Sequence, residues 1–256
     1  MFPTIPIGPL RLQTYGVFLL IAFWAGLWLA ARQAGRRGIP GDHVYNAGFY
    51  ALIGGLVAAR LGHVVAFFEV YRTDPRQVLS LSPGALLPGV GLVAALLVLA
   101  FYVWRHRLPP LPLADAAAPG MLLALAIAGV GTFLAGRDLG ILSDLPWAVE
   151  LFGVRRHPVA LYEALAALAL LAVVLVLDRR PHPTGYTALV ALFGYATIRL
   201  FLEPLRVEGL TVGDGWRVAQ VVALAAVAVS GWLLGRMAGA RATPGNGTSA
   251  PAGEVA

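Results

Sequence analysis

Residues 185–206 read GYTALVALFGYATIRLFLEPLR, an apolar run whose end carries charged side chains. The apolar part is about 20 residues long, the length at which a helix with a rise of about 1.5 Å per residue crosses the hydrocarbon core of a bilayer. Strands of a membrane barrel would be much shorter and would alternate in polarity. The run therefore predicts a transmembrane helix that ends in Arg199, Glu203 and Arg206.

The whole chain has the composition of an integral membrane protein. Of its 256 residues, 59% are hydrophobic and 12% are charged, and the mean hydropathy is +0.76, far from the mix of an ordinary soluble domain. We expect an all-α integral membrane protein with about seven transmembrane helices, built as one domain over residues 1–241 with a disordered tail over residues 242–256. The spans are expected near residues 13–31, 45–68, 84–104, 113–135, 157–177, 185–205 and 216–235.

The arginines of the short loops predict the orientation of the chain, because cytoplasmic loops of membrane proteins carry an excess of basic residues. We expect the N-terminus outside and the tail in the cytoplasm. The opening residues lack a basic n-region and a small-residue cleavage site, so no removable signal peptide is expected. The orienting arginines follow the first, third, fifth and seventh spans, at Arg32, Arg36, Arg37, Arg105, Arg107, Arg179, Arg180, Arg236 and Arg241.

Charge and cysteine content exclude several classes of function. The formal net charge is +6, but the arginines stand singly or in twos between apolar runs, without the basic stripe of a nucleic-acid-binding protein. The chain contains no cysteine, which excludes disulfides, thiolate nucleophiles and cysteine-ligated metals. No metal-ligand spacing appears either. We expect no nucleic-acid partner, no metal and no cofactor, and any thiol must come from a partner.

Polar residues within the spans are predicted to gather at one depth, near the headgroups of the outer leaflet. Arg60 and His63 are three residues apart on the second span and share a helical face. Arg199, Glu203 and Arg206 share a face of the sixth span at i, i+4 and i+7. An arginine at a helix centre costs about 2.5–3.5 kcal/mol on insertion scales, so it normally persists only where it is paired or functional. The other residues expected at this depth are Tyr15, Arg137, His157, Tyr162 and Glu163.

Several interpretations of these residues stay open. Arg199 and Glu203 could neutralise each other, arginines near span ends could snorkel to the interface, and the histidines and Tyr15 could be ordinary interfacial residues. A cluster with more cations than carboxylates instead indicates an anionic ligand, because the planar fork of arginine suits phosphate. The first candidate is the headgroup of an anionic phospholipid. A transporter or channel would require charges through the full depth of the bilayer or broken helices in paired halves.

Motifs along most of the chain resemble those of the bacterial phosphatidylglycerol–prolipoprotein diacylglyceryl transferases. RLQTYGVFLLIAF resembles the opening span of that family, with its tyrosine at Tyr15, and AARLGHVVAFF resembles its second-span motif, with its arginine at Arg60. RHPVALYEAL resembles the His-Pro-x-x-Leu-Tyr-Glu motif at His157, Tyr162 and Glu163. IRLFLEPLR resembles the Arg-x-x-x-Glu-x-x-Arg motif of the family at Arg199, Glu203 and Arg206. The seven spans and outward N-terminus of the family also match the predicted topology.

Two other motifs of the family are changed in this chain. Its His-Gly-Gly motif aligns with LLPGVGL, where Pro88 takes the place of the histidine. Its Gly-Arg-x-Gly-Asn-Phe-x-Asn-Gly-Glu signature aligns with AGVGTFLAGR, which keeps the glycine framework, and Gly140 also remains. The replacements in the signature are Gly129 for the arginine, Thr132 and Ala135 for the asparagines, and Arg137 for the glutamate.

The resemblance implies transfer of a diacylglyceryl group from phosphatidylglycerol to the lipobox cysteine thiol of a prolipoprotein, at the outer leaflet of the bacterial plasma (inner) membrane. The expected catalytic residues are His63, Arg199 and Glu203. Because Pro88 cannot accept a proton, the best remaining base is His63, which shares a helical face with Arg60, and His157 and Glu163 are the next candidates. The alternative is a non-catalytic relative that binds anionic phospholipid headgroups. The residues expected to bind substrate are Tyr15, Arg60, Arg137, Gly140, His157, Tyr162, Glu163 and Arg206.

Overall fold

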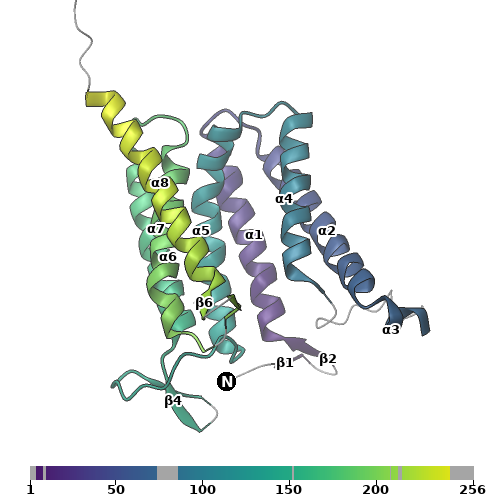
Figure 1. Ribbon diagram of the computed structural model, residues 1–256. Helices are drawn as coiled ribbons and strands as arrows, with labels where there is room; N and C mark the ends of the chain where they lie inside the picture. Colours follow the sequence, from purple (N-terminus) through teal and green to yellow (C-terminus); the bar gives the residue numbers. More distant parts are fainter. Residues whose placement is uncertain are drawn as a thin grey trace, which may run out of the picture.

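Seven long apolar helices form the membrane part of the computed structural model, which describes residues 4–7, 10–73, 86–151, 153–207, 209–212 and 215–242 (Figure 1). This confirms the predicted all-α architecture with seven spans. The helices of the bundle are α1 (Thr14–Gly35), α2 (Gly41–Ala66), α4 (Pro88–Arg105), α5 (Pro110–Leu134), α6 (Val159–Leu177), α7 (Tyr186–Leu202) and α8 (Val218–Ala242).

The helix ends differ from the predicted spans by a few residues, for identifiable reasons. The third span was expected from residue 84, but α4 begins at Pro88, since the fixed φ of proline suits the first helical position and its missing N–H is not needed there. At the other end of the chain, α8 continues through Ala242, past the predicted limit of residue 235. The predicted tail beyond Ala242 lies outside the described residues.

Short hairpins and turns gather at one end of the bundle (Figure 1). This end also carries the helix ends at which the polar residues were predicted, so these residues share one end of the molecule. The sequence prediction did not include the hairpins. The elements are the antiparallel pairs β1 (Thr4–Ile7) with β2 (Leu10–Gln13), β3 (Val149–Leu151) with β4 (Val154–Arg156) and β5 (Thr211–Val212) with β6 (Trp216–Arg217), helix α3 (Phe68–Thr73) and the 3₁₀ helix η2 (Glu203–Leu205).

Glycines let the helices approach closely in pairs. A Cβ on Gly26 of α1 would lie 2.9 Å from the carbonyl oxygen of Gly120 on α5, and a Cβ on Gly55 of α2 would lie 3.0 Å from that of Gly91 on α4. In lipid, where apolar burial does not drive helix association, such close backbone packing is a main source of stability. These glycines therefore form a close α1–α5 pair and a close α2–α4 pair within the bundle.

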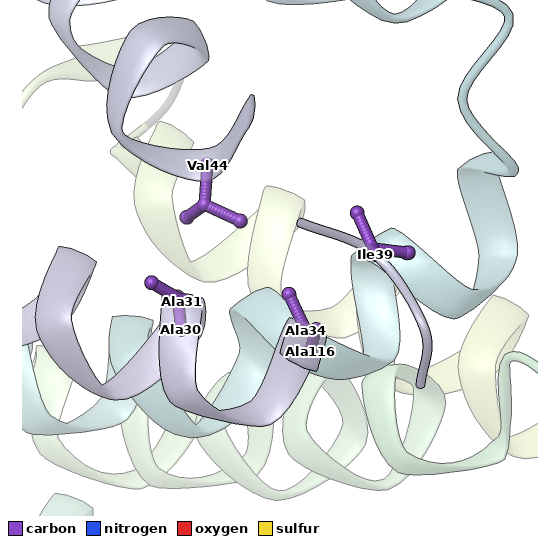
Figure 2. Packing of buried hydrophobic residues seen from close by; sticks show 6 residues of the cluster. All are labelled: Ala30, Ala31, Ala34, Ile39, Val44 and Ala116. Carbon is purple, nitrogen blue, oxygen red and sulfur yellow. The ribbon is translucent and has the colours of Figure 1, made fainter. Parts of the chain in front are cut away.

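Buried apolar clusters join these pairs into one bundle. Figure 2 shows the first cluster, in which the end of α1 and the start of α2 pack on α5 through Ala30, Ala31, Ala34, Ile39, Val44 and Ala116. A second cluster joins α5, α6 and α7 through Leu122, Leu171, Val174 and Ala191. Small side chains dominate the first cluster, which keeps α1 and α5 close together at the end of the bundle opposite the hairpins.

Candidate functional site

Five charged side chains from the ends of α5, α6 and α7 form the candidate site, which we call the ionic cluster. Arg206 pairs with Asp138 and Glu163, and its Nε lies 3.8 Å from Oε2 of Glu203. Arg199 donates from Nη2 to Oε2 of Glu203 at 2.8 Å, and its Nη1 lies 3.5 Å from Oε2 of Glu163. The predicted neighbours Arg199, Glu203 and Arg206 therefore do meet, and Glu163 joins them from α6.

The turn after α7 places Arg206 in the ionic cluster. The helix tightens into η2 at Pro204, which has no N–H to continue an α-helical ladder, and Arg206 then becomes extended with φ −87° and ψ 144°. Arg217 on β6 fixes this turn, because its Nη1 donates to the carbonyl oxygens of Glu203 at 2.8 Å and Arg206 at 2.9 Å. The sequence reasoning missed Arg217, since nothing in the local pattern shows that it reaches back to η2.

The loop after α5 supplies Asp138, a second residue that the sequence reasoning missed. Asp138 has a φ of +60°, a conformation that aspartate tolerates better than most residues, and it turns its carboxylate to Arg206. The backbone of the loop pairs with η2, since Ile141 N–H donates to Leu205 O and Val207 N–H donates to Leu139 O, both at 2.9 Å. Asp138 directly follows Arg137, so one loop brings charges of both signs to the site.

Gly140 has a steric role in this loop. A Cβ at Gly140 would lie 2.2 Å from the carbonyl oxygen of His157, so only glycine fits while the loop keeps its contact with the segment before α6. Gly140 forms a β-bridge with Arg206, and its carbonyl accepts from Nη1 of Arg156 at 3.0 Å. The predicted substrate-binding residue Gly140 thus holds together the segments that carry the ionic cluster.

Other predicted site residues meet in two groups at this end of the bundle. The Arg137 guanidinium lies 4.5 Å from the ring centroid of Tyr15, a cation–π contact between the loop after α5 and the start of α1. The Tyr162 hydroxyl accepts from Trp147 Nε1 at 2.8 Å and lies 3.4 Å from Nδ1 of His157. Tyr15 with Arg137, and His157 with Tyr162, thus form two contacts at the hairpin end of the bundle.

His63 and Arg60 belong to a different part of the hairpin end. His63 Nδ1 lies 3.0 Å from the hydroxyl of Tyr71 on α3, and the Arg60 guanidinium lies 5.3 Å from the ring centroid of the same tyrosine. The ring of Phe67 also stacks on His63, with 4.5 Å between centroids. These contacts lie on α2 and α3, while the ionic cluster is built from α5, α6 and α7.

The ionic cluster itself holds more carboxylates than guanidiniums, whereas the predicted cation excess concerned a wider set of residues that included Arg60 and Arg137. Three carboxylates, from Asp138, Glu163 and Glu203, face two guanidiniums. Burial lowers the pKa of Arg206, but an arginine starts so far above neutral pH that it stays charged. The Arg206 side chain is 9% exposed and that of Arg199 is 27% exposed, so Arg199 is the guanidinium of the cluster that a ligand can reach.

The hydroxyl of Tyr195 completes the surroundings of Glu163. Tyr195 donates to Oε1 of Glu163 from the turn of α7 that precedes Arg199. The sequence holds a signal for this contact, because Tyr195 and Arg199 are four residues apart and share a face of the helix.

Within the described residues, no three His, Asp or Glu side chains form a group that could hold a metal ion.

The positions where the family motifs are changed carry structural roles here. A Cβ at Gly129 would already lie 3.0 Å from the carbonyl oxygen of Ala160 and 3.0 Å from Cβ of Ala164, so an arginine at this position would require α6 to move. Pro88 begins α4. The glycine thus serves the close packing of α5 on α6, and the positive charge near this site comes from Arg137.

An apolar cavity of about 1200 Å³ lies away from the ionic cluster, between the α1–α5 and α2–α4 pairs. Its wall is almost free of polar groups, and its arginines, Arg105 and Arg107, lie at the end of the bundle opposite the hairpins. The cavity therefore offers volume for apolar groups but no side chains that could carry out acid–base chemistry near the ionic cluster.

The fold and this site define a polytopic membrane protein with a buried ionic cluster at one end of its helix bundle. Comparison with known proteins identifies its family, because the family model described as prolipoprotein diacylglyceryl transferase matches residues 3–236. The chain belongs to this family, as the motifs in the sequence indicated.

Bacterial proteins named phosphatidylglycerol–prolipoprotein diacylglyceryl transferase are similar to the chain over most of its length. It is 28% identical to the protein of Thermosynechococcus vestitus over 91% of each chain. It is 31% identical to the Clostridioides difficile protein, over 83% of this chain and 86% of the relative. It is 30% identical to the Bacillus cytotoxicus protein over 88% of each chain. With its seven apolar helices, the chain is a multi-pass membrane protein.

Proposed function

We propose that this protein transfers a diacylglyceryl group from phosphatidylglycerol to the lipobox cysteine thiol of a prolipoprotein, at the outer leaflet of the bacterial plasma (inner) membrane. The observation that carries the proposal is the ionic cluster, in which Arg199, Glu203, Arg206 and Glu163 are held together at one end of the bundle. Membership of the transferase family supports the same reaction. The names of the relatives favour a catalytic protein over a non-catalytic lipid-binding one.

The reaction needs stabilisation of negative charge on a phosphate. The thiolate sulfur attacks the carbon of the diacylglyceryl group that carries the phosphate ester. A C–S bond forms there, the bond from that carbon to the phosphate oxygen breaks, and glycerol phosphate leaves. Arginines near the leaving oxygen stabilise the charge that develops there. Arg199 is partly exposed and is oriented by Glu203, and Arg137 lies over Tyr15 at the same end, so these two guanidiniums are best placed to meet the phosphate. Arg206, enclosed by carboxylates, holds Glu163 and Glu203, the two carboxylates that also contact Arg199.

The reaction also needs a base, because a thiol with a pKa near 8.5 is only slightly ionised at neutral pH. We assign this role to His63. When its Nδ1–H donates to the Tyr71 hydroxyl, Nε2 is free of a proton and can accept one from the thiol. The next candidates are His157, beside Tyr162, and Glu163, whose carboxylate oxygens already bind Tyr195, Arg199 and Arg206.

The test is transfer of labelled diacylglycerol from phosphatidylglycerol to a lipobox peptide by the purified protein. We expect thioether product that falls by at least about a hundredfold in Arg199→Ala, as is typical when a group that stabilises developing charge is removed. His63→Gln is expected to lower the rate. Full activity in His63→Gln would remove that residue from the mechanism. Absence of product with wild-type protein, together with Arg199-dependent lipid binding, would establish the non-catalytic alternative.

A further inference from the structure

A second charged site lies at the end of the bundle opposite the ionic cluster. It is a cavity of about 680 Å³, a volume within the range of about 300–1000 Å³ that small-molecule sites usually have. We call its lining the basic pocket: Arg36 and Arg37 after α1, and Asp178, Arg179, Arg180, Pro181 and His182 after α6.

Buried contacts of Asp178 join the two walls of the basic pocket. Asp178, whose side chain is 8% exposed, pairs with Arg37 from the other wall. Its Oδ1 also accepts from the hydroxyl of Thr187 at 2.8 Å and lies 3.3 Å from Nε2 of His182. The ends of α1, α6 and α7 are thus tied together by one carboxylate, and the pocket is not a set of independent loop side chains.

Asp115 of α5 fixes the loop that forms the second wall. This buried carboxylate accepts from the backbone N–H groups of Gly185 at 2.6 Å and Ala188 at 2.8 Å, and so satisfies donors at the start of α7. The loop from Asp178 to Gly185 is therefore held at both ends. Its arginines are presented from a rigid frame, which lowers the entropy cost of binding a ligand.

The charge of the basic pocket favours an anion. Its lining contains four arginines and one carboxylate, and that carboxylate is already paired with Arg37. Arg36 donates from Nη1 to the neutral amide oxygen of Gln33 at 3.0 Å, which leaves its charge uncompensated by that contact. Arg179 and Arg180 are exposed at the mouth of the cavity. Guanidiniums arranged around a cavity suit a phosphate group.

The surroundings of the basic pocket favour a phospholipid as the ligand. Val173 and Val176, in the last two turns of α6, are 51% and 55% exposed, so the helix below the pocket presents an apolar face to lipid chains. Basic pockets between transmembrane helices on the cytoplasmic side bind anionic headgroups. We propose that the basic pocket binds the phosphate of an anionic phospholipid in the leaflet opposite the one that the ionic cluster faces.

Lipid binding by the full-length protein tests this proposal. Native mass spectrometry in a neutral detergent counts adducts of phosphatidylglycerol, with phosphatidylcholine of the same chains as the neutral probe. We expect Arg179→Gln with Arg180→Gln to lower the apparent affinity for phosphatidylglycerol by about thirtyfold, because each arginine near an anionic lipid surface contributes about fivefold. The charge-keeping pair Arg179→Lys with Arg180→Lys is expected to retain most of the binding.

Matched controls separate this site from general electrostatics and from the proposed transferase site. Arg105→Gln with Arg107→Gln removes the same charge at the same end of the bundle, outside the basic pocket, and is expected to leave the affinity within about twofold of wild type. Titrations in a background with Arg199→Ala and Arg137→Gln remove the two guanidiniums that the proposed function assigns to the substrate phosphate. Equal losses in the two glutamine pairs, or equal binding of phosphatidylcholine, would overturn the proposal. Displacement by inorganic phosphate at concentrations similar to that of the lipid would make this a site for free anions instead.

Discussion

Arg206→Gln is expected to be among the most destabilising substitutions at the hairpin end of the bundle. In the wild type, three carboxylates of the ionic cluster share two arginines, and the variant would leave them with Arg199 alone. Removing one partner of a buried ion pair costs about 3–5 kcal/mol, because the remaining charge is left buried and uncompensated. For a chain of this size the loss corresponds to a fall on the order of 10 °C in the unfolding temperature.

The assay is thermal unfolding in detergent at one scan rate, with Arg72→Gln as the matched control. Arg72 also pairs with a glutamate, Glu69, at 3.3 Å, but its side chain is 67% exposed. Exposed ion pairs contribute about 0–1 kcal/mol, so the control is expected to change the unfolding temperature by no more than about 4 °C. If Arg206→Gln lowered the unfolding temperature no more than the control, the ionic cluster would not be the buried network described above.

A double variant tests whether unpaired carboxylates are the cause of this destabilisation. Adding Asp138→Asn to Arg206→Gln removes one of the carboxylates that has lost its partner, so the double variant is expected to be more stable than Arg206→Gln by about 1–2 kcal/mol. Asp138→Asn alone is expected to destabilise, or at best leave unchanged, a cluster in which Arg206 still has Glu163 and Glu203. Strict additivity of the two substitutions would refute a direct interaction between Asp138 and Arg206.

Three further substitutions test other parts of the site and its frame. Gly140→Ala is expected to cost more than about 2 kcal/mol through the overlap with the carbonyl of His157, whereas Gly35→Ala, which meets nothing within 4 Å, is expected to be neutral or stabilising in thermal unfolding. Asp115→Asn is expected to cost about 1–3 kcal/mol in the same assay, because one of the two N–H groups that donate to the carboxylate would then face the NH₂ group of the amide and lose its acceptor. Tyr15→Leu removes the ring beneath Arg137 and is expected to raise the KM for phosphatidylglycerol about two- to fivefold in the transfer assay, with a smaller effect on kcat.

Local sequence patterns were sufficient to predict the spans and part of the site. Hydrophobic runs of membrane-crossing length have few alternatives to a helix, because every backbone polar group must be satisfied inside the bilayer. The contact of Arg199 with Glu203 follows from a spacing of four residues on one helix, and the structure confirms it at 2.8 Å. Topology then brought Tyr15 and Arg137 to the same end, where they form a contact.

The remaining parts of the site depend on loops whose paths the sequence does not specify. Asp138 reaches Arg206 only because the loop after α5 pairs with the segment after η2, a contact across almost seventy residues of chain. No helical or strand spacing encodes such a pairing. The same loop explains why the sequence did not show the charge balance within the ionic cluster, since Asp138 was not counted among the carboxylates that surround the arginines.

The geometry of this loop bears on whether the changed signature motif removes function. A side chain at position 129 would crowd α6 from its Cβ onward, but Arg137 brings a guanidinium to the hairpin end over Tyr15. A glutamate is replaced at position 137, but the next residue, Asp138, brings a carboxylate to Arg206. Both charges are thus present at the site, supplied by neighbouring residues of one loop. Charge stabilisation depends on where the charged atoms lie and not on which position in the chain carries them. The replaced signature residues are therefore compatible with catalysis. The test is the transfer assay, in which the rates of Arg137 and Asp138 variants are compared with the wild-type rate.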